Sequence, residues 1–276
     1  MSTSNFISEG HNMKIDYVVT FLDPSDPYWL EKFKPFQAVE FKSQPTRYDV
    51  DGVMHLKYNF RGIAKYMPWI DNLFLVVFSE SQVPKWINRN TVTVITDDMY
   101  IPSKFLPTFN TSTKQMHFHR IPNLGEHFIW GDDDQFAINP LSVSSFFDSD
   151  GNPNSERLYE VKMEKPKDAS DTWENIVYNS IKFAHVSTNT PLDGDTVIRQ
   201  PALHVPHPAL KSDLERCYNS NPRLVEESIT PCRAAKNIIG FTWCVVNGLK
   251  YRTKTSIRSF QIFGGNMNDE HNIKGM

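Results

Sequence analysis

The sequence has few cysteines and no long apolar segment. Its three cysteines, Cys217, Cys232 and Cys244, have no metal-ligand spacing, and an odd number of them does not predict a disulfide framework. No apolar run approaches the roughly 20 residues that span a bilayer. Residues 1–12 are polar and lack the apolar region of a signal peptide, so we expect a disordered leader there. These absences predict a cytoplasmic protein, and they leave open peripheral attachment to the inner face of the cell membrane.

The sequence contains no lysine- or arginine-rich run. Lys and Arg number 29 against 32 Asp and Glu, the formal net charge is −3, and no basic run stands out. A nucleic-acid partner therefore has no electrostatic support. The sequence also lacks a P-loop, a G-x-G-x-x-G fingerprint and a serine or cysteine nucleophile elbow, which argues against the enzyme classes that these motifs mark.

The first half of the chain alternates short strand-like runs with helical patterns. Runs rich in β-branched and aromatic residues predict strands over 15–22, 73–78, 91–96 and 127–130. Helical spacing is present over 28–39 and 56–66. Strands that alternate with helices are typical of an α/β fold, with a mixed, mainly parallel sheet flanked by helices.

The second half has a more helical pattern. Asp171 and Glu174 resemble a capping pair, and Pro208 is expected to open a helix at its first turn. The segment Trp243–Val246 fits a strand as well as a helix. Helices are expected over 171–185, 208–217 and 234–249. We expect three parts: a leader over 1–12, an α/β core over 13–140, and a mostly helical lobe over 141–276 that completes the active site.

Acidic side chains follow three of the predicted strands. Asp23 and Asp26 follow the first, Asp97 and Asp98 the third, and the run Asp132-Asp133-Asp134 the fourth. Ligands of parallel sheets bind beyond the carboxyl ends of the strands, so these groups are expected at one edge. Crowded carboxylates favour a hard divalent cation, and one left off the metal could accept a proton. A solvated acidic turn is the alternative interpretation.

Histidines and arginines supply further candidates. His204-Val205-Pro206-His207-Pro208 holds two histidines beside a proline-containing turn, which could hold a phosphate or move a proton. His117-Phe118-His119-Arg120 also holds two histidines, but on a helix these residues would point in several directions and form no single metal-binding face. Guanidinium groups bind phosphate oxygens in a bidentate manner. The arginines considered for this role are Arg47, Arg61 and Arg233. For each group, packing or a surface position remains an alternative.

Taken together, these segments resemble the Stealth family of hexose-1-phosphate transferases, which includes bacterial capsular polysaccharide phosphotransferases and the lysosomal-targeting N-acetylglucosamine-1-phosphotransferase. Residues 15–27 (IDYVVTFLDPSDP) are similar to the family's first region, a strand that ends in T-W-V-D/N-G-S/T-D-P. Pieces similar to the second region are 56–63 (LKYNFRGI), 66–70 (YMPWI), 82–88 (QVPKWIN), 106–110 (LPTFN), 117–122 (HFHRIP) and 128–134 (FIWGDDD). His204–His207 and Arg233 resemble parts of the third, so the likeness extends over about residues 15–233.

The resemblance implies roles for these residues. Asp133 and Asp134, which match the aspartates of the family's N-D-D segment, would form the centre of the site. Asp133 with Asp132 would hold a divalent cation and the diphosphate, with Mg²⁺ favoured over Mn²⁺, and Asp134 is favoured as the general base. Catalytic contacts to phosphate or acceptor are implied for His204, His207 and Arg233. Substrate contacts are implied for Asp23, Ser25, Asp26, Arg61, Asn110, His117, His119 and Arg120.

The implied reaction is transfer of sugar-1-phosphate from a UDP-sugar, either a UDP-N-acetylhexosamine or a UDP-hexose, to a hydroxyl of an oligo- or polysaccharide acceptor. UMP would leave, and the implied setting is bacterial capsule or exopolysaccharide synthesis. The implied fold is GT-A-like, with the nucleotide sugar bound by the core.

The sequence also departs from the family pattern. The family's W-V-D-G is Phe21-Leu22-Asp23-Pro24, its usual glutamate before H-x-H is Gln115, and the asparagine of N-D-D is Asp132. These changes keep two alternatives open: a metal-dependent glycosyltransferase that releases UDP, and an inactive carbohydrate-binding homologue.

Overall fold

The structure is a computed structural model. It describes residues 13–36, 52–154, 161–168, 172–192, 194, 196–199, 205–238 and 242–251. The expected leader over 1–12, Arg47 and His204 lie outside these ranges, as does the last part of the helix expected over 28–39.

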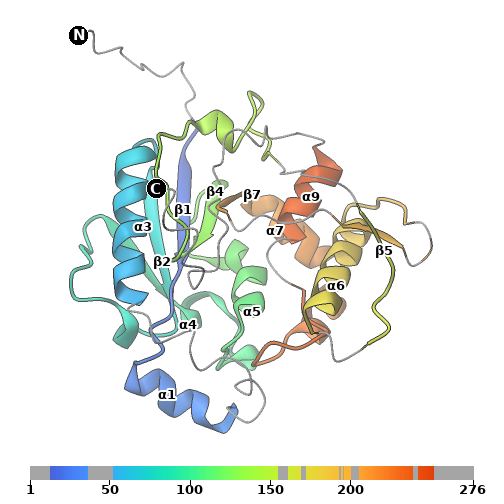
Figure 1. Cartoon of the computed structure of the whole chain (residues 1–276), viewed down its shortest axis with the longest axis horizontal. Helices are drawn as coiled ribbons and strands as arrows, with labels where there is room; N and C mark the ends of the chain where they lie inside the picture. Colours follow the sequence, from blue (N-terminus) through green and yellow to red (C-terminus); the bar gives the residue numbers. More distant parts are fainter. Residues whose placement is uncertain are drawn as a thin grey trace, which may run out of the picture.

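The core is a five-stranded sheet with the order β3-β2-β1-β4-β7 (Figure 1). Its strands are β1 (Ile15–Thr20), β2 (Asn72–Val77), β3 (Val92–Thr96), β4 (His127–Asp132) and β7 (His207–Leu210). The first four are parallel, and β7 is antiparallel to β4. The predicted mixed, mainly parallel α/β sheet is therefore confirmed, and all four predicted strands are present.

Strand β7 corrects one prediction. Pro208 does not open a helix, because it lies in β7 opposite Ile129, and the following helix begins at Lys211. An edge strand tolerates proline, which has no backbone N–H to donate to a ladder. Pro208 was expected to open a helix, but its segment pairs with a strand about 80 residues earlier. Local sequence does not reveal this contact.

Helices cover both faces of the sheet. The main ones are α3 (Gly52–Tyr66), α5 (Thr111–Met116), α6 (Thr172–Ser187), α7 (Lys211–Ser220) and α9 (Thr242–Lys250). Side chains alternate along each strand, so Tyr17 and Val19 pack with α3, whereas Val18 packs with residues of α5, α6, α7 and α9 on the other face. Figure 1 shows α3 on one side and those four helices on the other.

Shorter elements connect this framework. They are α1 (Pro27–Phe33), η1 (Lys34–Phe36), η3 (Glu80–Gln82), α4 (Asp97–Tyr100), η4 (Ser103–Phe105), η5 (Phe118–Arg120), η6 (Val143–Ser145), β5 (Val161–Met163), β6 (Val197–Arg199) and α8 (Pro222–Ser228). The helices expected over 56–66 and 171–185 are confirmed, and Trp243–Val246 lies in α9 rather than in a strand. The expected boundary at residue 140 stays a prediction, although the later half contributes β7 to the main sheet.

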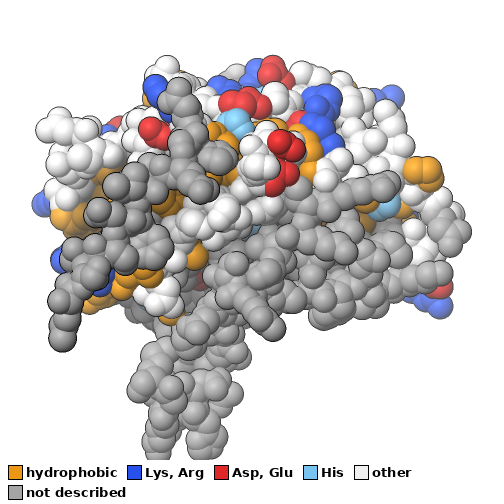
Figure 2. All heavy atoms as spheres, turned by 90° about the horizontal axis from the view of Figure 1, so that it is seen from above, with side chains coloured by type: hydrophobic (Ala, Val, Ile, Leu, Met, Phe, Trp, Pro, Cys, Tyr) orange, Lys and Arg blue, Asp and Glu red, His pale blue; other side chains and the backbone are white. Residues whose placement is uncertain are grey.

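The two ends of the sheet differ. Helix α1 extends beyond the carboxyl ends of the strands in Figure 1, whereas Figure 2 looks onto the amino ends. Acidic, basic and hydrophobic side chains are interspersed on the visible part of that surface. Within the described ranges, no helix has both the length and the apolar character needed to cross a membrane.

Candidate active site

The site is set by the order of the strands. Strands β1 and β4 are parallel neighbours, but the chain leaves β1 through α3 to reach β2 on the opposite side of β1. The direction of winding therefore changes between β1 and β4. In open α/β sheets, ligands bind outside the carboxyl ends of the strands at this switch point. Thr20 and Asp132 are paired in register at the ends of the two strands, so the acidic run begins at the switch point itself.

Asp132 is anchored to both strands and to the turn that follows. The hydroxyl of Thr20 donates to Asp132 Oδ1 over 3.0 Å, and the backbone N–H of Asp132 donates to Gln135 Oε1 over 3.2 Å. Tyr17 lies fully buried beneath, and burial together with the Asp132 carboxylate raises the pKa of its phenol. Tyr17 therefore stays a neutral hydroxyl beneath Asp132.

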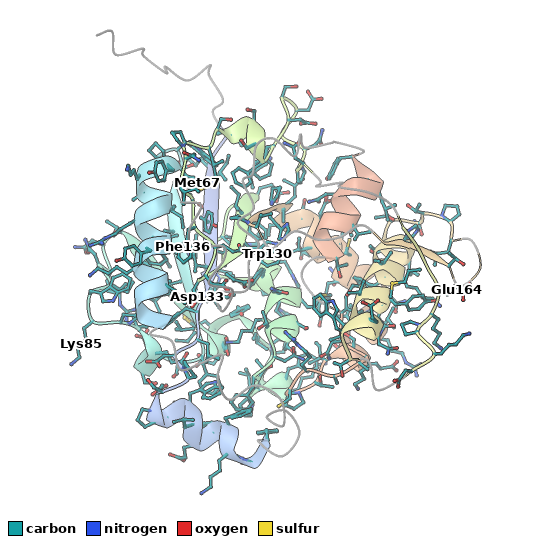
Figure 3. All side chains as sticks on the ribbon, in the orientation of Figure 1. Met67, Lys85, Trp130, Asp133, Phe136 and Glu164 are labelled. Atoms are coloured by element: carbon teal, nitrogen blue, oxygen red, sulfur yellow. The ribbon has the colours of Figure 1, made fainter. Side chains whose placement is uncertain are left out.

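Asn59 of α3 fixes the turn that carries the other two aspartates. Its side chain is completely buried, and Nδ2 donates to the carbonyl oxygens of Asp132 over 3.1 Å and of Gln135 over 2.6 Å. Both ends of the turn are thereby held by one amide. Between them, Asp133 is half-buried and Asp134 is exposed. Figure 3 places Asp133 toward the carboxyl ends of the strands, far from Met67 at the other end.

We expect Asn59→Ala to loosen the turn while leaving both aspartates in the chain. Loss of the two hydrogen bonds should lower the free energy of unfolding by about 1–3 kcal/mol. Misplacement of the carboxylates should lower kcat by about tenfold to a hundredfold. Urea unfolding and steady-state kinetics on the same preparation measure both effects. Unchanged kcat in a destabilised variant would show that the amide supports only the fold.

The loop after β1 provides the next group. Asp23 Oδ1 accepts from the N–H and the hydroxyl of Ser25 at 2.9 and 2.6 Å, and both residues are at least partly accessible. Asp26 is buried and caps α1 by accepting from the N–H groups of Tyr28 and Trp29. Asp26 thus organises the loop, whereas Asp23 and Ser25 stand at the edge where the nucleotide is expected.

Two residues after β2 complete this loop, and sequence reasoning missed both. The hydroxyl of Ser81 donates to Asp26 Oδ2 over 2.7 Å, and Gln82 Nε2 donates to the carbonyl oxygen of Asp23 over 3.1 Å. The loops after β1 and β2 are therefore bonded to one another. The available signal was the position of Ser81 and Gln82 just beyond a predicted strand.

Asp97 and Asp98, the acidic pair that follows β3, lie farther from the switch point between β1 and β4. Strand β3 is separated from β1 by β2, and Asp97 is buried with Oδ2 3.0 Å from Lys114 Nζ. Burial raises the pKa of the Asp97 carboxyl, with the lysine opposing this effect. Asp97 therefore belongs to the packing between α4 and α5 and is not a third carboxylate source at the switch point.

His117 and His119 lie inside the protein beside Tyr218. The His117 ring is fully buried, its Nδ1 lies 2.7 Å from the carbonyl oxygen of Thr113, and the two imidazoles are 5.5 and 5.1 Å from the Tyr218 ring. Burial lowers the pKa of His117 to about 4 and that of His119 to about 3. Both rings are neutral at pH 7, so neither offers a cationic phosphate contact. Their substrate role, like that of exposed Arg120, stays a prediction.

These depressed pKa values predict a pH-dependent stability. Free histidine titrates near 6.5, so between about pH 6.5 and pH 4 the unfolded chain binds protons that the buried rings do not. The free energy of unfolding should therefore be undiminished above about pH 6.5 and fall as the pH drops through that window. We expect His119→Gln to flatten this dependence in urea unfolding at neutral pH and at about pH 5. A slope as steep as that of the unmodified chain would contradict the prediction.

The structure brings two other predicted residues toward the same edge. His207 begins β7 opposite Trp130, two residues before Asp132, with ring centroids 4.9 Å apart. Arg233 is exposed and follows Cys232, which packs against Trp29 of α1. His207 and Arg233 therefore lie at the carboxyl-end side of the sheet, where His207 is buried and Arg233 is exposed. Their catalytic roles, and that of His204, stay predictions.

Asn110 supports the segment that contains Arg233. Its Oδ1 accepts from Ser112 N–H at the start of α5, and its Nδ2 donates to Cys232 O over 3.2 Å and to Asn237 Oδ1 over 3.0 Å. A substrate contact by this buried amide would have to replace one of those bonds. Asn110 acts here by joining the start of α5 to the loop of Arg233.

The carboxylates at the switch point suit a metal ion that binds together with the substrate. Among the described residues, no three acidic, histidine or cysteine side chains are close enough to form a complete metal site. Asp132 and Asp133 offer hard oxygen ligands from one turn. Mg²⁺ is commonly held by one or two carboxylates plus substrate phosphates and water, so this incomplete set fits a cation that arrives with a diphosphate.

Comparison with known proteins shows which family the chain resembles. Residues 49–155 match the family model described as Stealth protein CR2, conserved region 2. The chain carries conserved region 2 of the Stealth family. The match contains α3, β4 and the turn with Asp133 and Asp134, and it confirms the resemblance predicted from the motifs.

Several curated relatives are named as polysaccharide phosphotransferases. The capsular polysaccharide phosphotransferase LcbA of Aeromonas hydrophila is 30% identical over 210 residues, which cover 74% of this chain and 56% of that protein. The exopolysaccharide phosphotransferase cps2G of Lactiplantibacillus plantarum is 34% identical over 54% of this chain and 44% of its own length. The receptor polysaccharide phosphotransferase WefC of Streptococcus oralis is 33% identical over 51% and 43%. The chain thus spans about half the length of the curated relatives it matches.

Proposed function

We propose that this chain is a phosphotransferase that moves sugar-1-phosphate from a UDP-sugar to a hydroxyl of a glycan in bacterial capsule or exopolysaccharide synthesis. The observation that carries the proposal is the turn Asp132–Gln135, which Asn59 holds at the β1–β4 switch point inside the Stealth region. The relatives, which are named as polysaccharide phosphotransferases, support the reaction class. The donor, a UDP-N-acetylhexosamine or a UDP-hexose, would occupy a GT-A-like nucleotide pocket beside Asp23 and Ser25.

In the proposed mechanism the acceptor hydroxyl attacks the β-phosphorus of the donor. A bond forms between the acceptor oxygen and that phosphorus, the bond from phosphorus to the bridging oxygen breaks, and UMP leaves. Asp134, which is exposed, accepts the hydroxyl proton. Arg233 and His207 would contact phosphate oxygens from the same edge. A divalent cation held by Asp132 and Asp133, Mg²⁺ rather than Mn²⁺, would neutralise charge on the diphosphate.

Because the carboxylate set is incomplete, metal and nucleotide should bind cooperatively. We expect UDP to raise the affinity for Mg²⁺ by about tenfold or more, within the range typical of coupled sites. Isothermal titration with Mg²⁺, with and without UDP, measures the coupling, and Asp133→Asn should abolish it. Equal Mg²⁺ affinity in both titrations would contradict a site shared between the turn and the diphosphate.

The nucleotide product separates the proposed reaction from the main alternative. We expect UMP when the chain is incubated with a panel of UDP-sugars, Mg²⁺ and a mixture of oligosaccharide acceptors, followed by mass detection. Release of UDP would instead mean attack at the anomeric carbon and would assign the chain to the glycosyltransferases. If neither UMP nor UDP were released from any donor, the result would favour an inactive carbohydrate-binding homologue.

A further inference from the structure

A segment beyond the acidic turn follows α3 along its length. This segment, residues 135–141, is called the strap here. Its first carbonyl is bound by Asn59, Leu141 N–H donates to the carbonyl oxygen of Tyr66 over 3.0 Å, and Trp69 Nε1 donates to Leu141 O over 2.6 Å. The strap is therefore fixed to the helix at both ends.

Between these anchors the strap lies directly on the helix. A Cβ atom added to Gly62 would come within 2.6 Å of the carbonyl oxygen of Ala137, so a residue without a side chain is needed there. The Phe136 ring lies 6.1 Å from the ring of His55, one helical turn before Asn59. In Figure 3, Phe136 lies between Asp133 and Met67 along the direction of α3.

The strap and the outer face of α3 expose aromatic and apolar side chains. Tyr58, Phe136 and Ile138 are 52%, 45% and 45% exposed. Tyr58 is three residues from His55 and four from Gly62, the helix positions that contact the strap, so it lies on the side of α3 that the strap follows. Grouped exposure of this kind marks a binding surface more often than single exposed residues do.

The same face of α3 is basic. Lys57, Arg61 and Lys65 recur at four-residue spacing, which places them on one side of the helix, and α3 contains no acidic residue. Arg61 and Lys65 are exposed, and the Arg61 guanidinium lies 5.9 Å from the centre of the Tyr58 ring. The surface therefore combines rings that can stack on sugars with fixed positive charge.

We propose that this surface, made by Tyr58, Phe136, Ile138 and the basic row of α3, binds the acceptor as an anionic glycan that contains phosphodiesters. The inference rests on the proposed function, because each transferred sugar would add one phosphodiester to the growing chain. Charge complementarity with Arg61 and Lys65 then favours such an acceptor over a neutral one. The apolar C–H face of a pyranose ring can stack on the exposed aromatic rings.

Position also favours the acceptor. Phe136 follows Asp134 by two residues, so their Cα atoms are at most about 7 Å apart. A glycan whose terminal hydroxyl reaches Asp134 can thus lie along the strap. Three exposed side chains present much less than the about 800 Å² per partner of a stable dimer, so a second copy of the chain is a poorer occupant.

The experiment measures glycan binding without donor, by fluorescence anisotropy of two labelled oligosaccharides. One consists of hexose units joined by phosphodiesters, and the other is a dextran oligosaccharide of the same length. We expect the first to bind about tenfold more tightly, and Tyr58→Ala/Phe136→Ala or Arg61→Ala/Lys65→Ala to weaken its binding about three- to tenfold. Trp173→Ala and Lys85→Ala, an exposed ring and an exposed cation elsewhere, are the matched controls and should bind normally.

Unchanged binding in both double variants, or equal binding of the two oligosaccharides, would overturn the inference. So would variants that lose only their co-sedimentation with phosphatidylglycerol vesicles, because that result would assign the surface to a membrane. The double variants should also raise the acceptor KM in the transfer reaction with kcat unchanged. Normal transfer with an unchanged acceptor KM would defeat this inference alone, whereas absence of nucleotide release in every assay would defeat the proposed function alone.

Discussion

Replacing Asp134 with asparagine is expected to lower kcat for sugar-phosphate transfer by about 10²- to 10⁴-fold, the range of a general base. The amide has nearly the shape of the carboxylate but cannot accept the hydroxyl proton. Because Asp134 is exposed, the free energy of unfolding should change by less than about 0.5 kcal/mol. Steady-state rates with saturating donor and acceptor, together with urea unfolding, measure the two quantities.

The matched control is Asp98→Asn. Asp98 is also an exposed aspartate just beyond a strand, but it follows β3, which is separated from β1 by β2, and its Oδ1 accepts from the hydroxyl of Thr96. We expect near-normal turnover in this variant. If Asp134→Asn retained more than about a tenth of the activity, the base would have to be another group, with Asp133 as the next candidate.

Gly62→Ala is expected to destabilise the protein and to inactivate it, although alanine is the better helix former. Its new methyl group would meet Ala137 O at 2.6 Å and Ala137 N at 3.3 Å, and backbone atoms cannot move aside as a flexible side chain can. We expect a loss of about 1–3 kcal/mol in the free energy of unfolding. Displacement of the strap would also move Asp133 and Asp134 and lower kcat by about a hundredfold.

The opposite exchange in the same helix is the control. Ala64 is exposed on α3, so Ala64→Gly should cost about 0.5–1 kcal/mol through helix propensity and leave kcat unchanged. Thermal unfolding and kinetics of both variants decide the matter. A Gly62→Ala variant more stable than the unmodified chain, as propensity alone predicts, would show that the strap does not rest on this position.

The sheet and the position of the acidic turn were predictable because they depend on local pattern. Val18 and Val19 belong to a continuous apolar run, which is typical of a parallel strand buried on both faces. Asp132 follows such a run directly. The carboxyl-end rule then places Asp23 and Asp132 at one edge without knowledge of the strand order.

The same rule misled for Asp97, because it does not say which strand lies where. Strand order depends on contacts between distant segments, and it places β3 two strands from β1. The helix predicted to begin at Pro208 was wrong for a related reason, because the pairing of Pro208 with Ile129 overrides its tendency to open a helix. Local sequence carries neither piece of information.

The supporting residues of the site were harder to find than the aspartates. The helical spacing over 56–66 does not single out Asn59, although a polar residue next to Phe60 in the apolar pattern is a signal. Its function depends on carbonyl groups more than 70 residues later. For His117 the resemblance implies a substrate contact, which stays a prediction, and local sequence does not reveal that its ring is completely buried.

The proposed enzyme uses the turn at the switch point to transfer a sugar together with its phosphate. The most direct measurement uses a UDP-sugar radiolabelled at the β-phosphorus, incubated with an acceptor oligosaccharide and Mg²⁺. The label should appear in the glycan product with the unmodified chain and the Asp98→Asn control, and not with Asp134→Asn. Label that remains on the nucleotide while the glycan gains the sugar would contradict the account.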